Sequence, residues 1–222
     1  MRYRISEIKL DIRQSQEELP TAVRKKIKKK DLDIHDLKII KESVDARKKP
    51  DIKKVYTLEF SCSQKLPLKE AAERKYQVPV ADGSGKDRPV VVGFGPAGMF
   101  AGLILAEMGL NPVILERGEP VEQRIKTVQK FWKDGILDPE SNVQFGEGGA
   151  GTFSDGKLTT GIKDIRIGKV LEEFVEAGAD PSILYKQKPH IGTDKLQGIV
   201  RNIRRKIEML GGEIRFGSRL ED

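Results

Sequence analysis

The chain has 222 residues, 37% of them hydrophobic and 34% charged, with a formal net charge of +7. This composition excludes a disordered chain. The sequence has no apolar run of about 20 residues and no apolar core of a signal peptide, so we expect a cytoplasmic protein that has no membrane partner. A single cysteine excludes an intrachain disulfide and a Cys-x-x-Cys motif, and two unclustered histidines predict no metal site.

Charge and glycine are unevenly distributed along the chain. Residues 1–88 hold 23 Lys/Arg and 15 Asp/Glu, whereas the rest holds 18 and 19, and none of the 22 glycines precedes Gly83. A Pro/Gly/Asp/Ser-rich stretch without periodicity separates the two compositions. We therefore predict a small basic domain over residues 1–80, a linker over 81–88 and a second domain over 89–222.

The basic segment predicts an α+β domain. Apolar residues alternate over 4–12 and 55–62, which predicts two strands, and a third strand is predicted over 37–44. Cys62 is expected to be a small apolar residue that fills space at the end of the strand over 55–62. Apolar residues four apart over 16–30 predict a helix, and a further short helix is predicted over 68–75. The order of these elements is typical of a sheet covered by one or two helices.

Lysines crowd the last turns of the helix predicted over 16–30. Clustered cations of this kind can neutralise the phosphates of a nucleic acid. They can equally offset the helix dipole and keep an exposed face solvated. Aromatic residues for stacking on bases are not interleaved with these lysines, which favours the solvated face.

A glycine-rich motif follows the linker directly. A β-branched strand over 89–92 runs into Gly93-Phe94-Gly95-Pro96-Ala97-Gly98, a G-x-G-x-x-G pattern, and then into a helix over 96–108. A second buried strand over 112–116 ends in Glu116, 18 residues beyond Gly98. This complete β–α–β unit predicts a dinucleotide-binding site.

Each part of the motif has a physical function. Gly93 permits a tight turn, Gly95 permits a pyrophosphate to approach the backbone, and Gly98 permits close packing of helix on strand. The helix N-terminus offers free N–H groups to the phosphates. Glu116 is expected to accept both hydroxyls of a ribose and to repel a 2′-phosphate, which predicts FAD or NAD rather than NADP.

A second glycine cluster occupies residues 144–157, interleaved with Ser, Thr and Asp. Glycines this dense predict a loop whose backbone approaches a ligand closely rather than a packed element. A flexible surface loop is the alternative interpretation.

Helical spacing recurs in the rest of the chain. Helices are predicted over 119–132, with Trp132 facing the core, and over 167–177. A last helix is expected to be capped by Asp194 together with Gln197, and a final strand is predicted over 213–216.

Few side chains are candidates for acid–base or substrate-binding work. His190 lies in a Pro/Gly loop, and Lys157 and Asp155 lie beside the second glycine cluster. His190 could protonate or orient a substrate, and the other two could bind a carboxylate or flavin oxygens. A hydrogen-bonded loop histidine and a solvated Asp turn are the alternatives.

Residues 88–222 resemble the bacterial FAD-dependent dehydrogenases, a family of NAD(P)/FAD-dependent oxidoreductases with a Rossmann-type FAD domain. The matching stretches are VVVGFGPAGMFAGLILAEMG, VILERG, FWKDGILDPESNVQFGEGGAGTFSDGKLTT, VLEEFVEAGA, KPHIGTDKL and GGEIRF, and SVDARKK resembles the small domain that precedes them in the family. The cofactor-binding residues that the resemblance implies are Gly93, Gly95, Pro96, Ala97, Gly98, Glu116, Arg117, Gly148, Gly149 and Gly151.

The resemblance also implies a fold class and a function. Proteins of this family continue beyond the last predicted strand, so we expect an incomplete α/β Rossmann-type FAD-binding domain, truncated at its C-terminus, that needs the remainder of the flavoprotein chain. The implied function is a flavin-dependent oxidoreductase that binds FAD, uses NAD(P)H as electron donor or acceptor and acts on a small molecule of unspecified identity. A flavoprotein that acts on RNA through the basic domain, and a non-catalytic fragment, are the alternatives.

Overall fold

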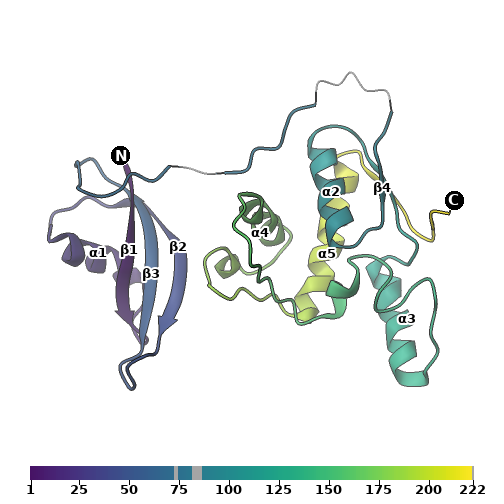
Figure 1. Ribbon diagram of the computed structural model, residues 1–222, viewed down its shortest axis with the longest axis horizontal. Coiled ribbons are helices and arrows are strands. Elements are labelled where there is room, and N and C mark those ends of the chain that lie inside the picture. The colour runs from purple at the N-terminus through teal and green to yellow at the C-terminus, as the bar shows by residue number, and fades with distance from the viewer. Residues whose placement is uncertain (73–74, 82–86, 222) are drawn as a thin grey trace. The chain divides into compact units, whose positions relative to one another are not determined.

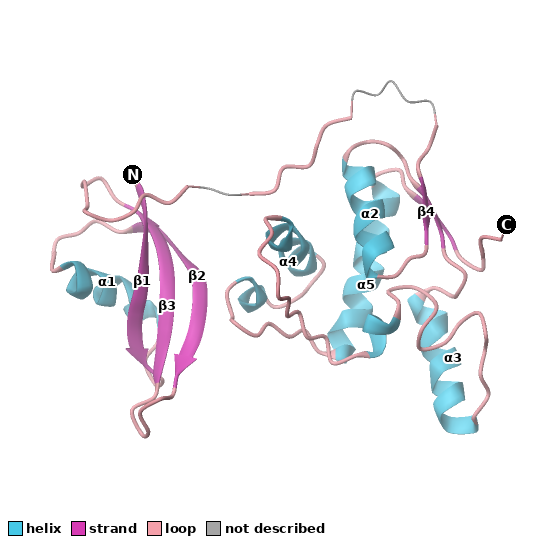
Figure 2. Cartoon of the chain, viewed as in Figure 1, coloured by secondary structure: helices cyan, strands magenta, loops and turns pink. Residues whose placement is uncertain are grey.

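The computed structural model describes residues 1–72, 75–81 and 87–221 (Figures 1 and 2). The chain divides into two compact units. The first unit comprises Met1–Arg74 with Ser182–Pro189, and the second comprises Lys75–Pro181 with His190–Asp222. The segment Ser182–Pro189 therefore belongs to the first unit, although the sequence places it in the second domain. Most of the predicted linker, residues 82–86, lies outside the described residues.

The first unit is an antiparallel sheet with a helix on one face (Figure 1). The strand order is β1 (Arg2–Asp11), β3 (Lys53–Ser61), β2 (His35–Asp45). The helical turn η1 (Gln16–Glu18) leads into α1 (Leu19–Ile27). This confirms the three predicted strands and shortens the predicted helix. The core includes Tyr3, Ile5, Ile8, Leu10, Leu19, Val23, Tyr56, Leu58 and Phe60.

Helix α1 ends earlier than the lysine run predicts. Lys28 adopts the left-handed conformation with φ of 59°, and its N–H donates to carbonyls of the last helical turn. The helix therefore ends at Ile27, three residues before the end of the predicted range. Cys62 is buried, as predicted, and its thiol contacts the carbonyl of Gln64 at 3.1 Å.

The outer edge of β1 is paired with an irregular segment. The N–H of Arg4 donates to the carbonyl of Lys69 at 3.0 Å, and the N–H of Ala71 donates to the carbonyl of Arg2 at 2.9 Å. The helix predicted over 68–75 is therefore wrong for residues 68–72, because their backbone groups extend the sheet. Residues 73–74 of that prediction lie outside the described residues.

The outer edge of β2 is paired with a segment from far along the chain. The N–H of Glu42 donates to the carbonyl of Tyr185 at 2.8 Å, and the N–H of Gln187 donates to the carbonyl of Glu42 at 3.1 Å. Paired edges protect a sheet from intermolecular strand addition. Residues far apart in sequence thus complete the sheet of the first unit.

The second unit contains a parallel sheet and most of the helices (Figure 2). The strand order is β4 (Val90–Val92), β5 (Val113–Leu115), β6 (Glu213–Arg215). Helix α2 (Pro96–Glu107) joins β4 to the parallel strand β5, which confirms the predicted β–α–β unit. The other helical elements of this unit are α3 (Val121–Asp134), η2 (Ala150–Phe153), α4 (Arg166–Glu176) and α5 (Thr193–Met209). The short η3 (Pro181–Leu184) begins at the last residue before the segment that belongs to the first unit.

Two local predictions in the second unit are wrong. Trp132 is 61% exposed, and its ring packs edge-on against Phe153 with centroids 5.9 Å apart, because Val121 and Val128 supply the buried face of α3. Helix α5 is not capped by Asp194 with Gln197, because it begins at Thr193 after Gly192.

Among the described residues, the structure contains no helix with both the length and the apolar character required to cross a bilayer.

Candidate functional site

The first glycine motif forms the turn between β4 and α2. Gly93 has φ of +88°, which permits the tight exit from the strand. Gly95 is the N-cap of α2 and makes no side-chain capping bond, and the next two residues, Pro96 and Ala97, are exposed. The first-turn N–H groups of α2 therefore open onto solvent, as an anion-binding helix end requires.

The space around the missing side chain differs between the glycines of this motif. A Cβ at Gly98 would lie 1.9 Å from the carbonyl oxygen of Gly93, so only glycine allows this packing of helix against strand. A Cβ at Gly95 would meet only the Cα of Gly149, at an ordinary 3.9 Å. The fold therefore requires glycine at position 98 but not at 95, where the missing side chain leaves room beside the helix end.

The second glycine cluster lies directly against the first. The N–H of Gly148 donates to the carbonyl of Phe94 at 2.8 Å, and a Cβ at Gly149 would lie 3.3 Å from the Cα of Gly95. Gly151 lies near the Pro96 ring, since its Cβ would approach that ring to 4.0 Å. The structure thus brings the two predicted glycine motifs together.

This cluster is more ordered than a plain loop. It includes the helical turn η2, and Glu147 and Thr152 are buried within it. The Thr152 hydroxyl donates to the carbonyl of Glu147 at 3.1 Å. The expectation that residues 144–157 contain no packed element is therefore wrong for this part of the segment.

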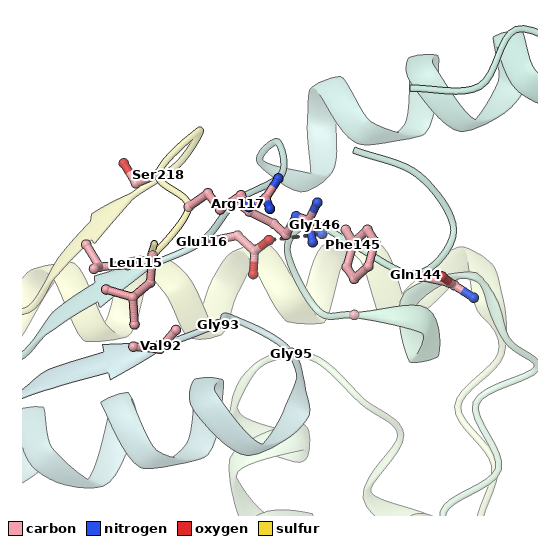
Figure 3. Close-up of a pocket in the computed structure, with 13 residues that line it drawn as sticks. Val92, Gly93, Gly95, Leu115, Glu116, Arg117, Gln144, Phe145, Gly146 and Ser218 are labelled. Carbon is pink, nitrogen blue, oxygen red and sulfur yellow. Dashed lines mark hydrogen bonds between the residues drawn. The ribbon is translucent and has the colours of Figure 1, made fainter. Parts of the chain in front are cut away.

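A cleft of about 320 Å³ opens at the carboxyl ends of β4, β5 and β6 (Figure 3). Ligands of open α/β sheets bind at this edge. Of the predicted cofactor-binding residues, it is lined by Gly93, Gly95, Glu116, Arg117 and Gly149. It is also lined by Gln144, Phe145 and Gly146 from the predicted ligand-binding loop, and by three residues that the sequence patterns did not indicate, Ser218, Arg219 and Leu220.

The Glu116 side chain lines this cleft and accepts hydrogen bonds from three loops around it (Figure 3). Only 4% of the residue is exposed. Its Oε1 accepts the N–H groups of Gly118 and Gly146 at 2.8 and 3.0 Å, and its Oε2 accepts that of Phe94 at 2.7 Å. A carboxylate has about four acceptor positions, so one is left, on Oε2. The acceptance of ribose hydroxyls by Glu116 stays a prediction, for which this one acceptor position is left.

Arg117 forms one wall of the cleft. Its guanidinium lies 4.0 Å from the centroid of the Phe145 ring. Glu140 accepts from Arg117 at 2.9 Å and pairs with Arg219 at 3.2 Å. The two cations that line the cleft are thus partly neutralised by one shared carboxylate.

Buried charges lie beside the second glycine cluster. Arg124 is fully buried and donates to the carbonyls of Asn142, Val143 and Glu147 at 2.9, 2.9 and 2.5 Å. Burial lowers its pKa to about 10, although Glu116 and Glu147 oppose that shift. Arg124 therefore remains a cation at neutral pH and holds the backbone of the loop. Helical spacing alone gave no signal for this role.

Glu147 is an unusual acid in the same region. It is fully buried, its Oε2 accepts the N–H of Val121 at 2.6 Å, and its Oε1 lies 3.3 Å from Nε of Arg204. Burial raises the pKa of Glu147 to about 7. A carboxyl inside a glycine cluster is the signal that could have identified it.

The three acid–base candidates lie near one another but away from the cleft. Lys157 pairs with Asp155 at 2.8 Å and forms an isolated antiparallel bridge with His190. All three are exposed. The hydrogen bond to Asp155 raises the pKa of Lys157, so this lysine is a cation rather than a base. Lys157 lies at an apolar cavity of about 310 Å³.

Comparison with known proteins gives two similarities. Residues 2–61 match a domain of unknown function, DUF8436. A Clostridium beijerinckii protein described as an uncharacterized protein is 49% identical over 231 aligned positions, which cover all of this chain and 43% of that protein. The chain thus spans less than half the length of this relative.

Proposed function

We propose that the second unit binds FAD as the cofactor-binding part of a flavin-dependent oxidoreductase. The observation that carries this proposal is the convergence of an uncapped, exposed helix N-terminus, two glycine motifs in contact, and a buried glutamate at the edge of a parallel sheet. The cleft, at about 320 Å³, lies at the lower end of the range of about 300–1,000 Å³ for ligand pockets. It therefore fits the nucleoside end of a dinucleotide, and the rest would extend past α2.

Named residues of this chain would hold the cofactor. The N–H groups of Ala97 and Gly98 would bind the pyrophosphate, and the free acceptor position of Glu116 would take one ribose hydroxyl. The stacked Arg117 and Phe145 form a flat surface beside Glu116 on which an adenine ring could pack. When bound, the flavin would supply hydride-transfer chemistry, so no nucleophile of the protein is required.

The same geometry supports FAD or NAD over NADP. Glu116 lines the cleft, and its carboxylate would repel a 2′-phosphate on a ribose bound beside it. The arginines that could offset that charge, Arg117 and Arg219, are both paired with Glu140. An anionic group on a substrate would have to compete with Asp155 for the protonated Lys157, since the two side chains pair at 2.8 Å.

A nucleotide panel tests this proposal. The intact chain is titrated with FAD, ADP, NAD⁺ and NADP⁺, and binding is followed by flavin fluorescence and by the shift in melting temperature. We expect FAD to bind most tightly, ADP to compete with it, and NADP⁺ to bind most weakly. NAD⁺ binding without FAD binding would refute the assignment of a flavin, and failure to bind any nucleotide would refute the site itself.

A further inference from the structure

The two faces of the sheet in the first unit differ in chemistry. The apolar core and α1 cover one face. The strand register places the alternate residues on the other, which we call the open face. Its cross-strand rows are Arg2–Ser61–His35, Arg4–Glu59–Lys38, Thr57–Lys41, Lys9–Val55–Ser43 and Asp11–Lys53–Asp45.

Charge on the open face is divided between its two ends. At one end, Lys53 pairs with Asp11 at 3.3 Å, and Lys9 pairs with Asp45 at 3.4 Å. The two lysines at this end are therefore neutralised by the two aspartates. At the other end, the cross-strand rows hold four lysines and arginines and one carboxylate, that of Glu59. We call this end the cationic half, comprising Arg2, Arg4, Lys38, Lys41 and Glu59.

Glu59 holds two arginines of the cationic half in place. The residue is 8% exposed and accepts from Nε of Arg2 at 3.1 Å and from Nε of Arg4 at 3.0 Å. Burial raises the pKa of Glu59, but the hydrogen bonds from Arg4 and Arg2 outweigh it and lower the pKa overall. Each guanidinium keeps N–H donors that Glu59 does not use, so two forked donors are fixed in advance.

A groove and hydroxyl groups adjoin these cations. The groove, of about 260 Å³, is lined by Arg4, Lys69, Glu70, Ala71 and Ala72. The hydroxyl of Thr57, in the central strand β3, lies 3.4 Å from that of Ser6 in β1. Cations of this kind bind phosphates, and hydroxyls can bond the 2′-hydroxyl that distinguishes RNA from DNA.

The lysine cluster of α1 is a weaker candidate for the same role. Nζ of Lys26 donates to the carbonyls of Ser6 and Glu7 at 2.8 and 2.9 Å, and Nε of Arg24 donates to the carbonyl of Leu32 at 3.0 Å. These cations stabilise the fold of the first unit. The structure therefore favours the open face over the helix end that the sequence singled out.

We propose that the cationic half of the open face binds the backbone of single-stranded RNA. Arg2, Arg4, Lys38 and Lys41 would contact phosphates, and Thr57 would contact a ribose 2′-hydroxyl. The cross-strand rows of the open face contain no aromatic residue for base stacking, so binding would be independent of sequence and strongly dependent on salt. This inference does not depend on the proposed flavin site.

The test uses the full chain and a fluorescein-labelled RNA of mixed sequence, about 20 nucleotides long to exceed single-strand site sizes. Anisotropy is measured between 50 and 200 mM KCl, bracketing physiological salt. The variant K38A/K41A removes two exposed lysines, and K25A/K30A removes two exposed lysines from α1 and the turn after it. We expect K38A/K41A to weaken binding about tenfold at low salt and to flatten the salt slope by about 1.4, since each contact to a single strand contributes about 0.7. K25A/K30A should change affinity less than about threefold.

Several outcomes would overturn the proposal. One is a wild-type Kd for RNA weaker than about 100 μM at 50 mM KCl, and another is an equal loss of RNA affinity in K38A/K41A and K25A/K30A. Equal affinity for DNA of the same sequence would overturn the assignment to RNA. Binding to phosphatidylserine vesicles that K38A/K41A abolishes, without RNA binding, would assign the surface to lipid instead. Circular dichroism of both variants confirms that they are folded.

Discussion

Replacing Glu116 tests whether one carboxylate organises the cleft. In Glu116→Ala, three backbone N–H groups, those of Phe94, Gly118 and Gly146, lose an acceptor that lies 2.7 to 3.0 Å away. Each buried donor left unpaired costs about 1–3 kcal/mol. We therefore expect a loss of about 3 kcal/mol or more, a large part of the 5–15 kcal/mol that is typical of a domain.

Glu116→Gln provides a graded comparison. The amide oxygen can still accept from Gly118 and Gly146, whereas its NH₂ group faces the N–H of Phe94. The expected loss is that of one hydrogen bond, about 1–3 kcal/mol. Glu140→Ala, which removes only partly exposed ion pairs at the rim of the cleft, should cost less than about 1 kcal/mol.

Urea unfolding followed by tryptophan fluorescence measures these losses in the second unit, because Trp132 is the single tryptophan of the chain and lies in α3. The expected order of stability is Glu140→Ala, then Glu116→Gln, then Glu116→Ala. If Glu116→Ala unfolded within about 0.5 kcal/mol of wild type, the three hydrogen bonds would not hold the cleft together.

Two further predictions concern stability. Gly98→Ala should destabilise the second unit by more than about 3 kcal/mol, because its Cβ would lie 1.9 Å from the Gly93 carbonyl oxygen. Gly168→Ala, with nothing within 4 Å of its Cβ, should instead stabilise α4 by up to about 1 kcal/mol. Equal melting temperatures of the two variants would contradict this packing. The pKa of Glu147 is raised from 4.5 to about 7, so the folded state holds its proton more tightly than the unfolded state does, and this residue's contribution to stability should fall by about 3 kcal/mol as pH rises from 4.5 to 7. Glu147→Gln should flatten the dependence of unfolding free energy on pH in that window, and an unchanged profile would refute the assignment.

Short-range patterns predicted the elements well. The β–α–β unit was predictable because its strands are short apolar runs, its glycines lie at fixed spacing, and Pro96 begins the helix. The failures have local physical reasons. Residues 68–72 contain helix-forming residues, but hydrogen bonding to the edge of β1 overrides that preference. Trp132 follows the helical period, but it lies near the end of α3, where its ring packs on Phe153.

Long-range contacts could not be predicted in the same way. The pairing of Glu42 with the segment around Lys186 joins residues more than 140 positions apart, and no local pattern specifies it. The sequence predicted that each of the two glycine motifs lies near a ligand, but it did not predict that Gly149 and Gly95 lie in contact with each other. One of the three hydrogen bonds that Glu116 accepts comes from Gly146, which the pattern of the first motif does not include.

The proposed flavin site is tested most directly by the affinity for FAD of Gly95→Ala. Gly95 has φ of −72°, and its Cβ would meet only the Cα of Gly149 at 3.9 Å, so alanine fits the fold but occupies the space beside the helix N-terminus. Gly198→Ala, in α5 with nothing within 4 Å of the new methyl group, is the matched control. We predict that Gly95→Ala unfolds like the wild type but binds FAD at least tenfold more weakly, while Gly198→Ala binds FAD as the wild type does. Equal FAD affinity in all three proteins, or no FAD binding by the wild type, would contradict the account.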